Sequence, residues 1–253
     1  METPLSAASE IAIAILRERA PLAFDLAERF KASGFRLALV GGPVRDALLG
    51  RLGNDLDFTT DARPEDTKKI LKKWGDDIWD VGIKFGTIGA KKSNITFEVT
   101  TYRADSYQSD SRKPEVDFGD NIHGDLARRD FTVNAMAIEL TTDSPEFIDP
   151  HNGVTDLLKK SLRTPNAPEL SFSDDPLRML RAARFAAQLG FTIDEAVVEA
   201  MKAMADRLSI ISAERIRDEF VKTLMSDNPR VGITILVDTG LCEKFLPEIP
   251  KLR

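Results

Sequence analysis

The sequence predicts an α+β fold: a small mixed sheet with helices in the first 160 residues, and helices alone in the remainder. Two observations lead to this expectation. Up to about residue 160, short apolar segments typical of strands alternate with helical patterns. From Ser173 onward the pattern is helical throughout, and four residues suited to helix capping recur: Ser173, Thr192, Ser212 and Asp227. We therefore expect one domain over residues 1–162 and a second over residues 163–253.

The first domain opens with two helices over residues 5–33, where Pro21 starts the second and Gly34 ends it. The expected elements that follow are a strand at 36–40, a helix at 43–49, a strand at 55–59, a helix at 64–74, and strands at 78–81, 86–90 and 95–102. Residues 104–124 are polar and lack a period, which predicts a long functional or mobile loop. A helix from near Asp130 and a strand at 137–140 complete this half.

Composition narrows the class of protein. The 253 residues are 42% hydrophobic and 30% charged, as in ordinary soluble proteins. The single cysteine, Cys242, excludes a disulfide framework, and two distant histidines, His123 and His151, disfavour a histidine metal site. We find no signal peptide and no apolar run that could span a membrane, so we expect a cytoplasmic enzyme. The net charge of −6 argues weakly against nucleic-acid binding but does not exclude a local basic groove.

The segment from Leu39 to Phe58 is the most informative: LVGGPVRDALLGRLGNDLDF. On a strand, Asp55 and Asp57 point to one face, where they can hold hard cations such as Mg²⁺. Glycines before a helix let backbone N–H groups approach a phosphate. An isolated Asp-x-Asp is more often a turn, but the preceding Gly-Gly-Pro-Val-Arg-Asp favours metal-assisted chemistry on a nucleoside triphosphate.

Glu98 is a candidate third carboxylate. Its neighbours Phe97 and Val99 point to one face of the predicted strand, so Glu98 points to the other. A solvent-facing strand residue is an equally good interpretation.

Polar residues are dense in the segment RRDFTVN, residues 128–134. Asp130 could cap a helix, with the arginines as its ion-pair partners. In the functional alternative, Arg129 binds a triphosphate and Asp130 accepts a hydrogen bond from a ribose 2′-OH.

A stripe of charged residues follows on the next predicted helix: Asp175, Arg178, Arg181 and Arg184. A solvated, ion-paired face is the simplest interpretation. However, arginine only donates and ionised aspartate only accepts hydrogen bonds. An Asp–Arg pair therefore matches cytosine and adenine, which place an exocyclic amine beside a ring-nitrogen acceptor. It would reject uracil and guanine, whose polar groups would be left unpaired.

Together these segments resemble the bacterial class II tRNA nucleotidyltransferases, the CCA-adding enzymes, whose head is shared with poly(A) polymerases of the polymerase-β-like superfamily. Five ordered segments from about Phe35 to Arg253 carry the resemblance: LVGGPVRDALLG with DLDF, RRDFTVNAMA, IDPHNGVTDL, SDDPLRMLRAARFAAQLGF and ISAERIRDEF. The resemblance implies a polymerase-β-like nucleotidyltransferase head followed by an all-α neck and the start of a body, with the C-terminal tail domains absent.

The resemblance also assigns roles. Asp55 and Asp57 match the carboxylates that bind two Mg²⁺ ions. Glu98 remains a catalytic candidate on the strand alternation alone. Asp175 and Arg178 match the pair that reads the incoming base. Gly42, Arg45, Arg129, Asp130, Arg181 and Arg184 match further nucleotide-binding residues of the family. We also expect Gly41, Asp46 and Asn134, in the same segments, to bind the nucleotide.

Two positions depart from the family pattern. Asp174 stands where the family usually has Glu, and His151-Asn152 replaces an aromatic residue and a glycine. Asparagine tolerates glycine-like backbone angles best, so we expect the turn at Asn152 to be kept.

The implied function is addition of CMP, CMP and AMP to tRNA 3′ ends from CTP and ATP. The alternatives are a poly(A) polymerase, a specialist for CC or A alone, and a non-catalytic nucleotide-binding or tRNA-binding module. The segments GIKFGT and EVTTYR resemble CCA-adding members more than poly(A) polymerases. The family also has a flexible loop at 104–124, to which we assign a part in the switch from CTP to ATP. The sequence does not reveal the oligomeric state.

Overall fold

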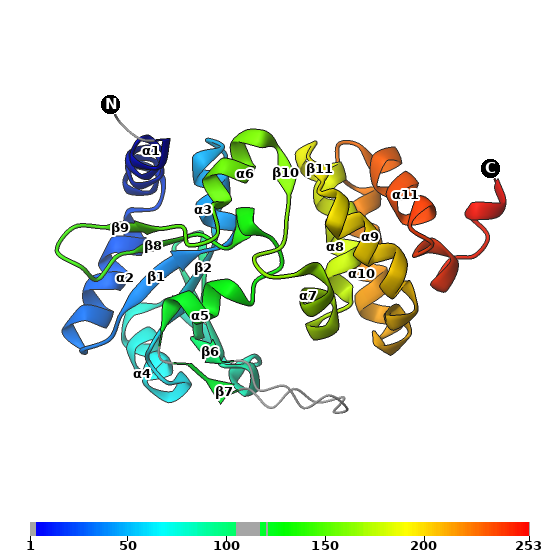
Figure 1. Ribbon diagram of the computed structural model, residues 1–253. Helices are drawn as coiled ribbons and strands as arrows, with labels where there is room; N and C mark the ends of the chain where they lie inside the picture. Colours follow the sequence, from blue (N-terminus) through cyan, green and yellow to red (C-terminus); the bar gives the residue numbers. More distant parts are fainter. Residues whose placement is uncertain (1–3, 105–116, 120, 253) are drawn as a thin grey trace. The chain divides into compact units, whose positions relative to one another are not determined.

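The computed structural model describes residues 4–104, 117–119 and 121–252 (Figure 1). The chain forms two compact units. The first comprises Met1–Arg128 and Val133–Val154, and the second Arg129–Thr132 and Thr155–Arg253. The short segment Arg129–Thr132 thus belongs to the second unit although it lies within the sequence of the first. The predicted domain limits at 162 and 163 remain a prediction.

A mixed seven-stranded sheet forms the centre of the first unit, with strand order β3-β4-β5-β2-β1-β8-β9. The strands are β1 (Leu37–Val40), β2 (Asp55–Thr60), β3 (Asp77–Trp79), β4 (Thr87–Lys92), β5 (Ile95–Thr101), β8 (Ala137–Glu139) and β9 (Glu146–Ile148). Only the pair β2–β5 is parallel; the other neighbours run antiparallel. The short strands β6 (Arg103–Ala104) and β7 (Asp117–Phe118) pair separately.

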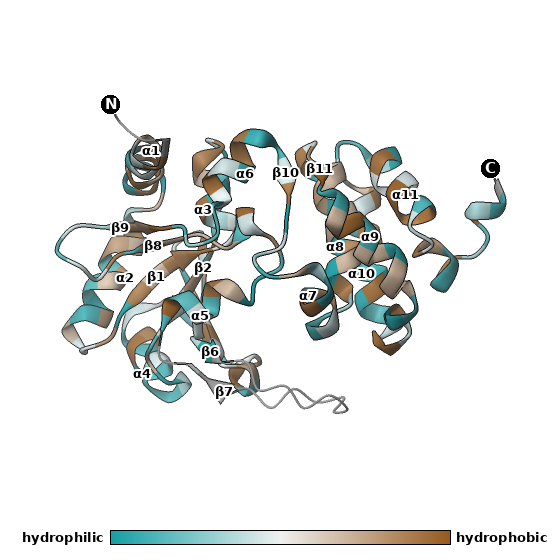
Figure 2. Cartoon of the chain, in the orientation of Figure 1, coloured by the Kyte–Doolittle hydropathy of each residue, from teal (hydrophilic) through white to brown (hydrophobic). Residues whose placement is uncertain are grey.

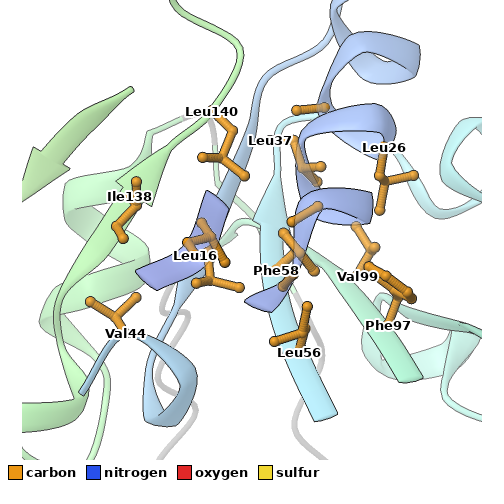
Figure 3. Close-up of a cluster of buried hydrophobic side chains, with 14 of the residues drawn as sticks. Leu16, Leu26, Leu37, Val44, Leu56, Phe58, Phe97, Val99, Ile138 and Leu140 are labelled. Carbon is orange, nitrogen blue, oxygen red and sulfur yellow. The ribbon is translucent and has the colours of Figure 1, made fainter. Parts of the chain in front are cut away.

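Helices of the first unit bury one face of this sheet. They are α1 (Pro4–Arg19), α2 (Pro21–Ala32), α3 (Gly42–Leu48) and α4 (Pro64–Trp74). The unit also contains helix α5 (Ile122–Ala127) and a 3-10 turn, η1, at Ile83–Phe85. Figure 3 shows Leu16 and Leu26 of the first two helices packed on strand residues such as Phe58 and Phe97. Leu56 on β2 belongs to the same core. Because strand side chains alternate, the residues between these core positions face the opposite side of the sheet.

That opposite side is covered over part of its width. Helix α5 packs there through Ile122 and Leu126, which form a small cluster with Ala38, Val40 and Ala137. Ala38 and Val40 lie on β1, and Ala137 lies on β8. At this end of the sheet both faces are therefore buried, whereas residues at the start of β2 on the same face are exposed.

The second unit is built around helix α8, which packs on α10 and α11. Its elements are β10 (Ser161–Leu162), α7 (Pro168–Asp174), α8 (Leu177–Leu189), β11 (Thr192–Ile193), α9 (Glu195–Met204), η3 (Ala205–Ile210), α10 (Ala213–Leu224), α11 (Pro229–Asp238), η4 (Cys242–Lys244) and η5 (Pro250–Leu252). Gly232 on α11 allows close approach, since a Cβ there would lie 2.4 Å from Thr223 and 3.2 Å from the Ala187 Cβ. In Figure 2, brown apolar segments alternate with teal polar segments along α8 and α11.

Helix α6 (Gly153–Lys159) begins at the turn that departs from the family pattern. Asn152 has φ of 61°, as expected for an asparagine in place of glycine. The Asp149 carboxylate accepts hydrogen bonds from the backbone N–H groups of Gly153 and Val154, at 2.6 and 3.0 Å. The turn is kept, as predicted.

Several predicted elements are wrong. No α-helix begins at Asp130: the chain forms only a 3-10 turn, η2, at Thr132–Asn134, and becomes a strand, β8, at Ala137. The Thr132 N–H donates to the Arg163 carbonyl. The predicted loop 104–124 contains the start of α5, which Asn121 caps by accepting from the Gly124 N–H. Within the same loop, Asp117–Phe118 form the short strand β7. Residues 105–116 and 120 lie outside the described residues.

The second half is not helical throughout. Residues 161–162 and 192–193 form a two-stranded parallel pair, β10–β11, so Thr192 caps no helix. Asp194 caps α9 in its place, and Ser173 lies inside α7. Ser212 caps α10 as predicted, whereas Asn228, not Asp227, precedes α11. In the described part of the chain, every helix is too short or too polar to cross a bilayer.

Candidate active site

The predicted catalytic carboxylates lie on one face of the sheet. Asp55 and Asp57 are exposed on β2, whereas Leu56 and Phe58 between and beside them are buried in the core. On the parallel neighbour β5, Glu98 is also exposed and lies directly opposite Asp57. Residues in register on neighbouring strands point to the same face, and neighbouring strands lie about 4.8 Å apart. The three carboxylates therefore share the face opposite the core.

These carboxylates are suited to Mg²⁺. They offer hard oxygen donors on an exposed, rigid strand pair. Among the described residues, no group of three or more His, Cys, Asp or Glu side chains is arranged as a complete metal site. Mg²⁺ is usually held by one or two carboxylates, with water and substrate phosphates as its other ligands. The residues present fit that mode of binding.

The two glycines after β1 make the turn into α3. Gly41 has φ of 73° and ψ of −133°, a conformation that requires glycine. Its N–H donates to the Met136 carbonyl at 3.2 Å, and its carbonyl accepts from the Arg45 N–H. The Gly41 N–H is thus already engaged, and the structure supports a turn-forming role for this residue.

Arg45, Asp46 and Asn134 form one hydrogen-bonded cluster. The Arg45 guanidinium donates to both Asp46 oxygens at 3.0 and 2.9 Å, and to the Asn134 Oδ1 at 2.5 Å. Arg45 and Asn134 are 5% and 4% exposed. Arg51 also contacts Asp46. Three residues predicted to bind nucleotide are thus brought together across 89 positions of sequence, with Arg45 largely buried.

In the second unit, Asp130 pairs with Arg181. The Asp130 Oδ2 accepts from the Arg181 Nε at 2.8 Å and from Nη2 at 2.6 Å, while its Oδ1 accepts from the Phe131 N–H. Burial lowers the pKa of Arg181, but the charge and hydrogen bonds of Asp130 outweigh this, so the pKa is raised. Arg129, next to this pair, is half-buried.

Glu219 extends this pair into a buried network. It lies on α10, 4% exposed, and its carboxylate contacts the Arg184 Nε at 2.6 Å and the Arg181 Nη1 at 3.5 Å. Burial lowers the pKa of Arg184, an effect that Glu219 opposes. The Arg184 guanidinium also lies over the Phe185 ring at 4.1 Å. The sequence alone did not point to a role for Glu219.

Asp175 is not on a helix, so the expected stripe of four residues is wrong. It lies between α7 and α8 in extended conformation, with φ of −145° and ψ of 99°. Its Oδ1 accepts from the Leu177 N–H at 3.1 Å, and its Oδ2 accepts from the Arg215 Nη2 at 2.8 Å. Arg215, on α10, is a second residue that sequence reasoning missed.

Arg178 begins the arginine row of α8. Its backbone N–H donates to the Asp175 carbonyl at 3.0 Å, so the two residues are close neighbours. Its Nη1 donates to the Ser171 Oγ at 2.9 Å and lies 3.9 Å from Asp174. Asp175 and Arg178 therefore lie in one tight turn, each held by a residue from a neighbouring helix.

Comparison with known proteins identifies the family. A family model described as the poly A polymerase head domain matches residues 37–163, about half of the chain. A second, described as a probable RNA and SrmB-binding site of polymerase A, matches residues 190–252. The chain belongs to the poly(A) polymerase head-domain family. The expected nucleotidyltransferase head with a mixed sheet, followed by a helical region, is confirmed.

Relatives of this family member are named CCA-adding enzymes. One from Lactobacillus helveticus is 40% identical over 222 residues, which is 87% of this chain and 54% of the relative. A crystal structure of the Bacillus stearothermophilus CCA-adding enzyme in complex with CTP is 35% identical, with a TM-score of 0.77 over 87% of this chain and 52% of that one. A Thermotoga maritima CCA-adding enzyme complexed with tRNA is 28% identical, with a TM-score of 0.78 over 93% and 55%. The chain spans about half the length of these relatives.

Proposed function

We propose that this protein is a template-independent RNA nucleotidyltransferase that adds CMP, CMP and AMP to the 3′ end of tRNA, using CTP and ATP and releasing pyrophosphate. One observation carries the proposal. Three exposed carboxylates, Asp55, Asp57 and Glu98, share the face of a rigid strand pair that the hydrophobic core leaves open. The names of the relatives support the choice of nucleotides and of tRNA.

Asp55 and Asp57 are the residues that would hold two Mg²⁺ ions. When bound, such ions neutralise the charge that develops on the triphosphate and the attacking hydroxyl. The chain itself supplies the rigid carboxylate pair. Phe58 and Phe97, whose rings stack 5.9 Å apart on the core face, keep β2 and β5 in place beneath the carboxylates. Glu98 would add negative charge beside Asp57 and favour cation binding there.

Asp175 and Arg178 would read the base of the incoming nucleotide. Arg178 donates to the ring nitrogen of cytosine or adenine, and Asp175 accepts from the exocyclic amine. The bonds from Arg215 to Asp175 and from Arg178 to Ser171 support this role, because they fix the two side chains before a nucleotide binds.

The arginine network around Asp130 would bind the sugar and triphosphate. Arg129 would contact the triphosphate, and Asp130, held by Arg181, would accept from the ribose 2′-OH. Arg184 contributes positive charge to the same network. In the first unit, Arg45, Asp46 and Asn134 would stabilise the turn at Gly41 and Gly42 next to β2.

The test is incorporation of labelled CTP and ATP, each alone and both together, into a tRNA that lacks its 3′ terminus, with and without Mg²⁺. Addition of two CMP followed by one AMP, abolished by a metal chelator, is the expected result. Stepwise addition of AMP alone to many residues would indicate the poly(A) polymerase alternative. CC or A addition alone would indicate a specialist, and binding without incorporation would indicate a non-catalytic module.

RNA recognition and location form part of the same proposal. Residues 190–252, which match the probable RNA-binding model, would contact the tRNA. The cytoplasm, where tRNA is processed in bacteria, is the proposed location.

A further inference from the structure

A tryptophan shares the carboxylate face of the sheet. The strand register places Trp79 on β3 opposite Gly89 on β4, Gly89 opposite Glu98 on β5, and Glu98 opposite Asp57 on β2. Residues in one such row point to the same face. Trp79 and the two carboxylates therefore lie in a single row across four strands.

Gly89 leaves the gap that the indole fills. A Cβ placed on Gly89 would lie 2.0, 2.1 and 2.5 Å from three atoms of the Trp79 indole. The ring thus lies across β4, on the carboxylate face, and extends from the edge strand β3 toward Glu98. Trp79 is half-buried, so part of the ring remains accessible. The other tryptophan, Trp74, is 5% exposed in the core.

A lysine lies beside the indole on the same face. Lys91 on β4 is exposed and is the next residue after Gly89 on this face. The register pairs it with Thr96 on β5, which lies opposite Asp55, and with exposed Asp77 on β3. Within the described residues, no ion pair joins Lys91 to Asp77. An aromatic ring next to a cationic side chain is the combination with which proteins bind single-stranded RNA.

We propose that Trp79, lying over Gly89, is a stacking platform for a base at the 3′ end of the RNA primer, with Lys91 contacting its phosphate backbone. The inference rests on the proposed function, which requires two reactants at the carboxylates. Asp175 and Arg178 account for the base of the incoming nucleotide. None of the residues assigned to the incoming nucleotide or to the metal ions is assigned to bind the base of the primer.

The chemistry of repeated addition favours stacking at this position. Each added nucleotide becomes the new 3′ end, so the primer site must accept different bases in turn. Every base has a π-face, and stacking on an aromatic ring tolerates them all, whereas hydrogen bonds to base edges would select one. Strand spacing of about 4.8 Å places β3 roughly 14 Å from β2. Because the indole crosses β4, the platform reaches to within about one strand of Glu98.

The competing explanation is purely structural: the indole covers a glycine near the sheet edge and stabilises the strands. The two explanations differ in what RNA does to the indole. A platform changes its fluorescence when a base stacks on it, whereas a packing residue does not respond.

The experiment uses the 253-residue chain carrying Trp74→Phe, which leaves Trp79 as its one tryptophan. A short oligoribonucleotide that ends in two cytidines is titrated while the fluorescence of Trp79 is followed. Saturable quenching is expected. Affinity is then measured by anisotropy of the labelled oligonucleotide for the wild type, Trp79→Phe, Trp79→Leu and Gly89→Ala. Trp79→Leu keeps apolar bulk over Gly89 but removes the ring, whereas Gly89→Ala keeps the ring but displaces it.

We expect Trp79→Leu to weaken RNA binding roughly 5- to 150-fold, the equivalent of one stacked base, and Trp79→Phe to weaken it less. Gly89→Ala should weaken it while thermal unfolding remains cooperative. In turnover, Trp79→Leu should raise KM for the primer and leave KM for CTP unchanged. Absent quenching, or equal RNA affinity in wild type and a folded Trp79→Leu, would overturn the platform.

Failure of the proposed function would look different. A chain whose Trp79 is quenched by RNA but that incorporates no nucleotide would refute the nucleotidyltransferase activity and leave the platform standing. Incorporation with an unchanged primer KM in Trp79→Leu would refute the platform and leave the activity standing.

Discussion

The two units use charge in opposite ways. In the first, Asp55, Asp57 and Glu98 are exposed carboxylates on one face of the sheet, an arrangement of like charges that attracts an external cation. In the second, Asp130 and Glu219 are buried, and each is compensated by arginines of the same unit. Exposed side chains of like charge favour the binding of an oppositely charged ligand. Buried pairs of opposite charge hold the paired side chains in one geometry. Substitutions in the two regions should therefore fail in different ways.

The largest effect is expected in the first region. Asp57→Asn or Asp55→Ala should reduce CMP incorporation by more than about a hundredfold, because metal binding contributes several kcal/mol to such reactions. The urea midpoint should stay near that of the wild type, since both side chains are exposed. Asp77→Asn is the matched control, an exposed aspartate on the same face at the edge strand. Near-normal incorporation in both carboxylate variants would show that Asp55 and Asp57 do not hold the catalytic metal ions.

Stability should suffer most in the second region. Glu219→Ala leaves Arg184 without its buried counter-charge and removes the second carboxylate that contacts Arg181, so we expect a loss of about 3–5 kcal/mol in the free energy of unfolding. Urea denaturation measures it. Lys222→Ala, which removes an exposed partner of Glu219, should cost under about 1 kcal/mol. Equal losses of stability in the two variants would show that the buried ion pairs of Glu219 with Arg181 and Arg184 do not stabilise the fold.

Base selection should be sensitive to Arg178. Arg178→Ala removes a charge-assisted donor worth about 1.5–3 kcal/mol, so CTP use should slow by roughly 10- to 150-fold. Discrimination against UTP should relax, because no donor then opposes the N–H of uracil. The measurement is the ratio of kcat/KM for CTP and UTP. If this ratio were unchanged in both Arg178→Ala and Asp175→Ala, the two residues would not select the base. Their role in this turn would then be structural only.

The smallest effect on stability is expected at Arg215. Its bond to Asp175 is part-exposed, so Arg215→Ala should change the free energy of unfolding by less than about 1 kcal/mol. It should nevertheless lower the preference for CTP over UTP, because Asp175 loses the contact that orients it. Arg217→Ala, on the same helix and paired with Asp218, is the control that should leave selectivity intact. Equal selectivity in the two variants would show that Asp175 needs no such support.

Local signals predicted most elements well because they act over a few residues. Prolines at the first turn started α2 and α4, and the alternation of apolar and acidic residues identified the exposed face of β2. The break at Asp175 was also encoded locally. A residue before proline avoids helical backbone angles, and Pro176 follows Asp175. The local sequence therefore argues against one helical stripe that runs from Asp175 to Arg184.

The sequence by itself determined which groups are present and which strand face they occupy, because alternation and capping are short-range. Only the tertiary structure decided the partners. Asp130 meets Arg181 across 51 positions, and Asp175 meets Arg215 across 40. Trp79 finds its space over Gly89 only once β3 and β4 pair in register. Such contacts depend on how helices and strands distant in sequence pack together, and no local preference of the chain specifies that packing.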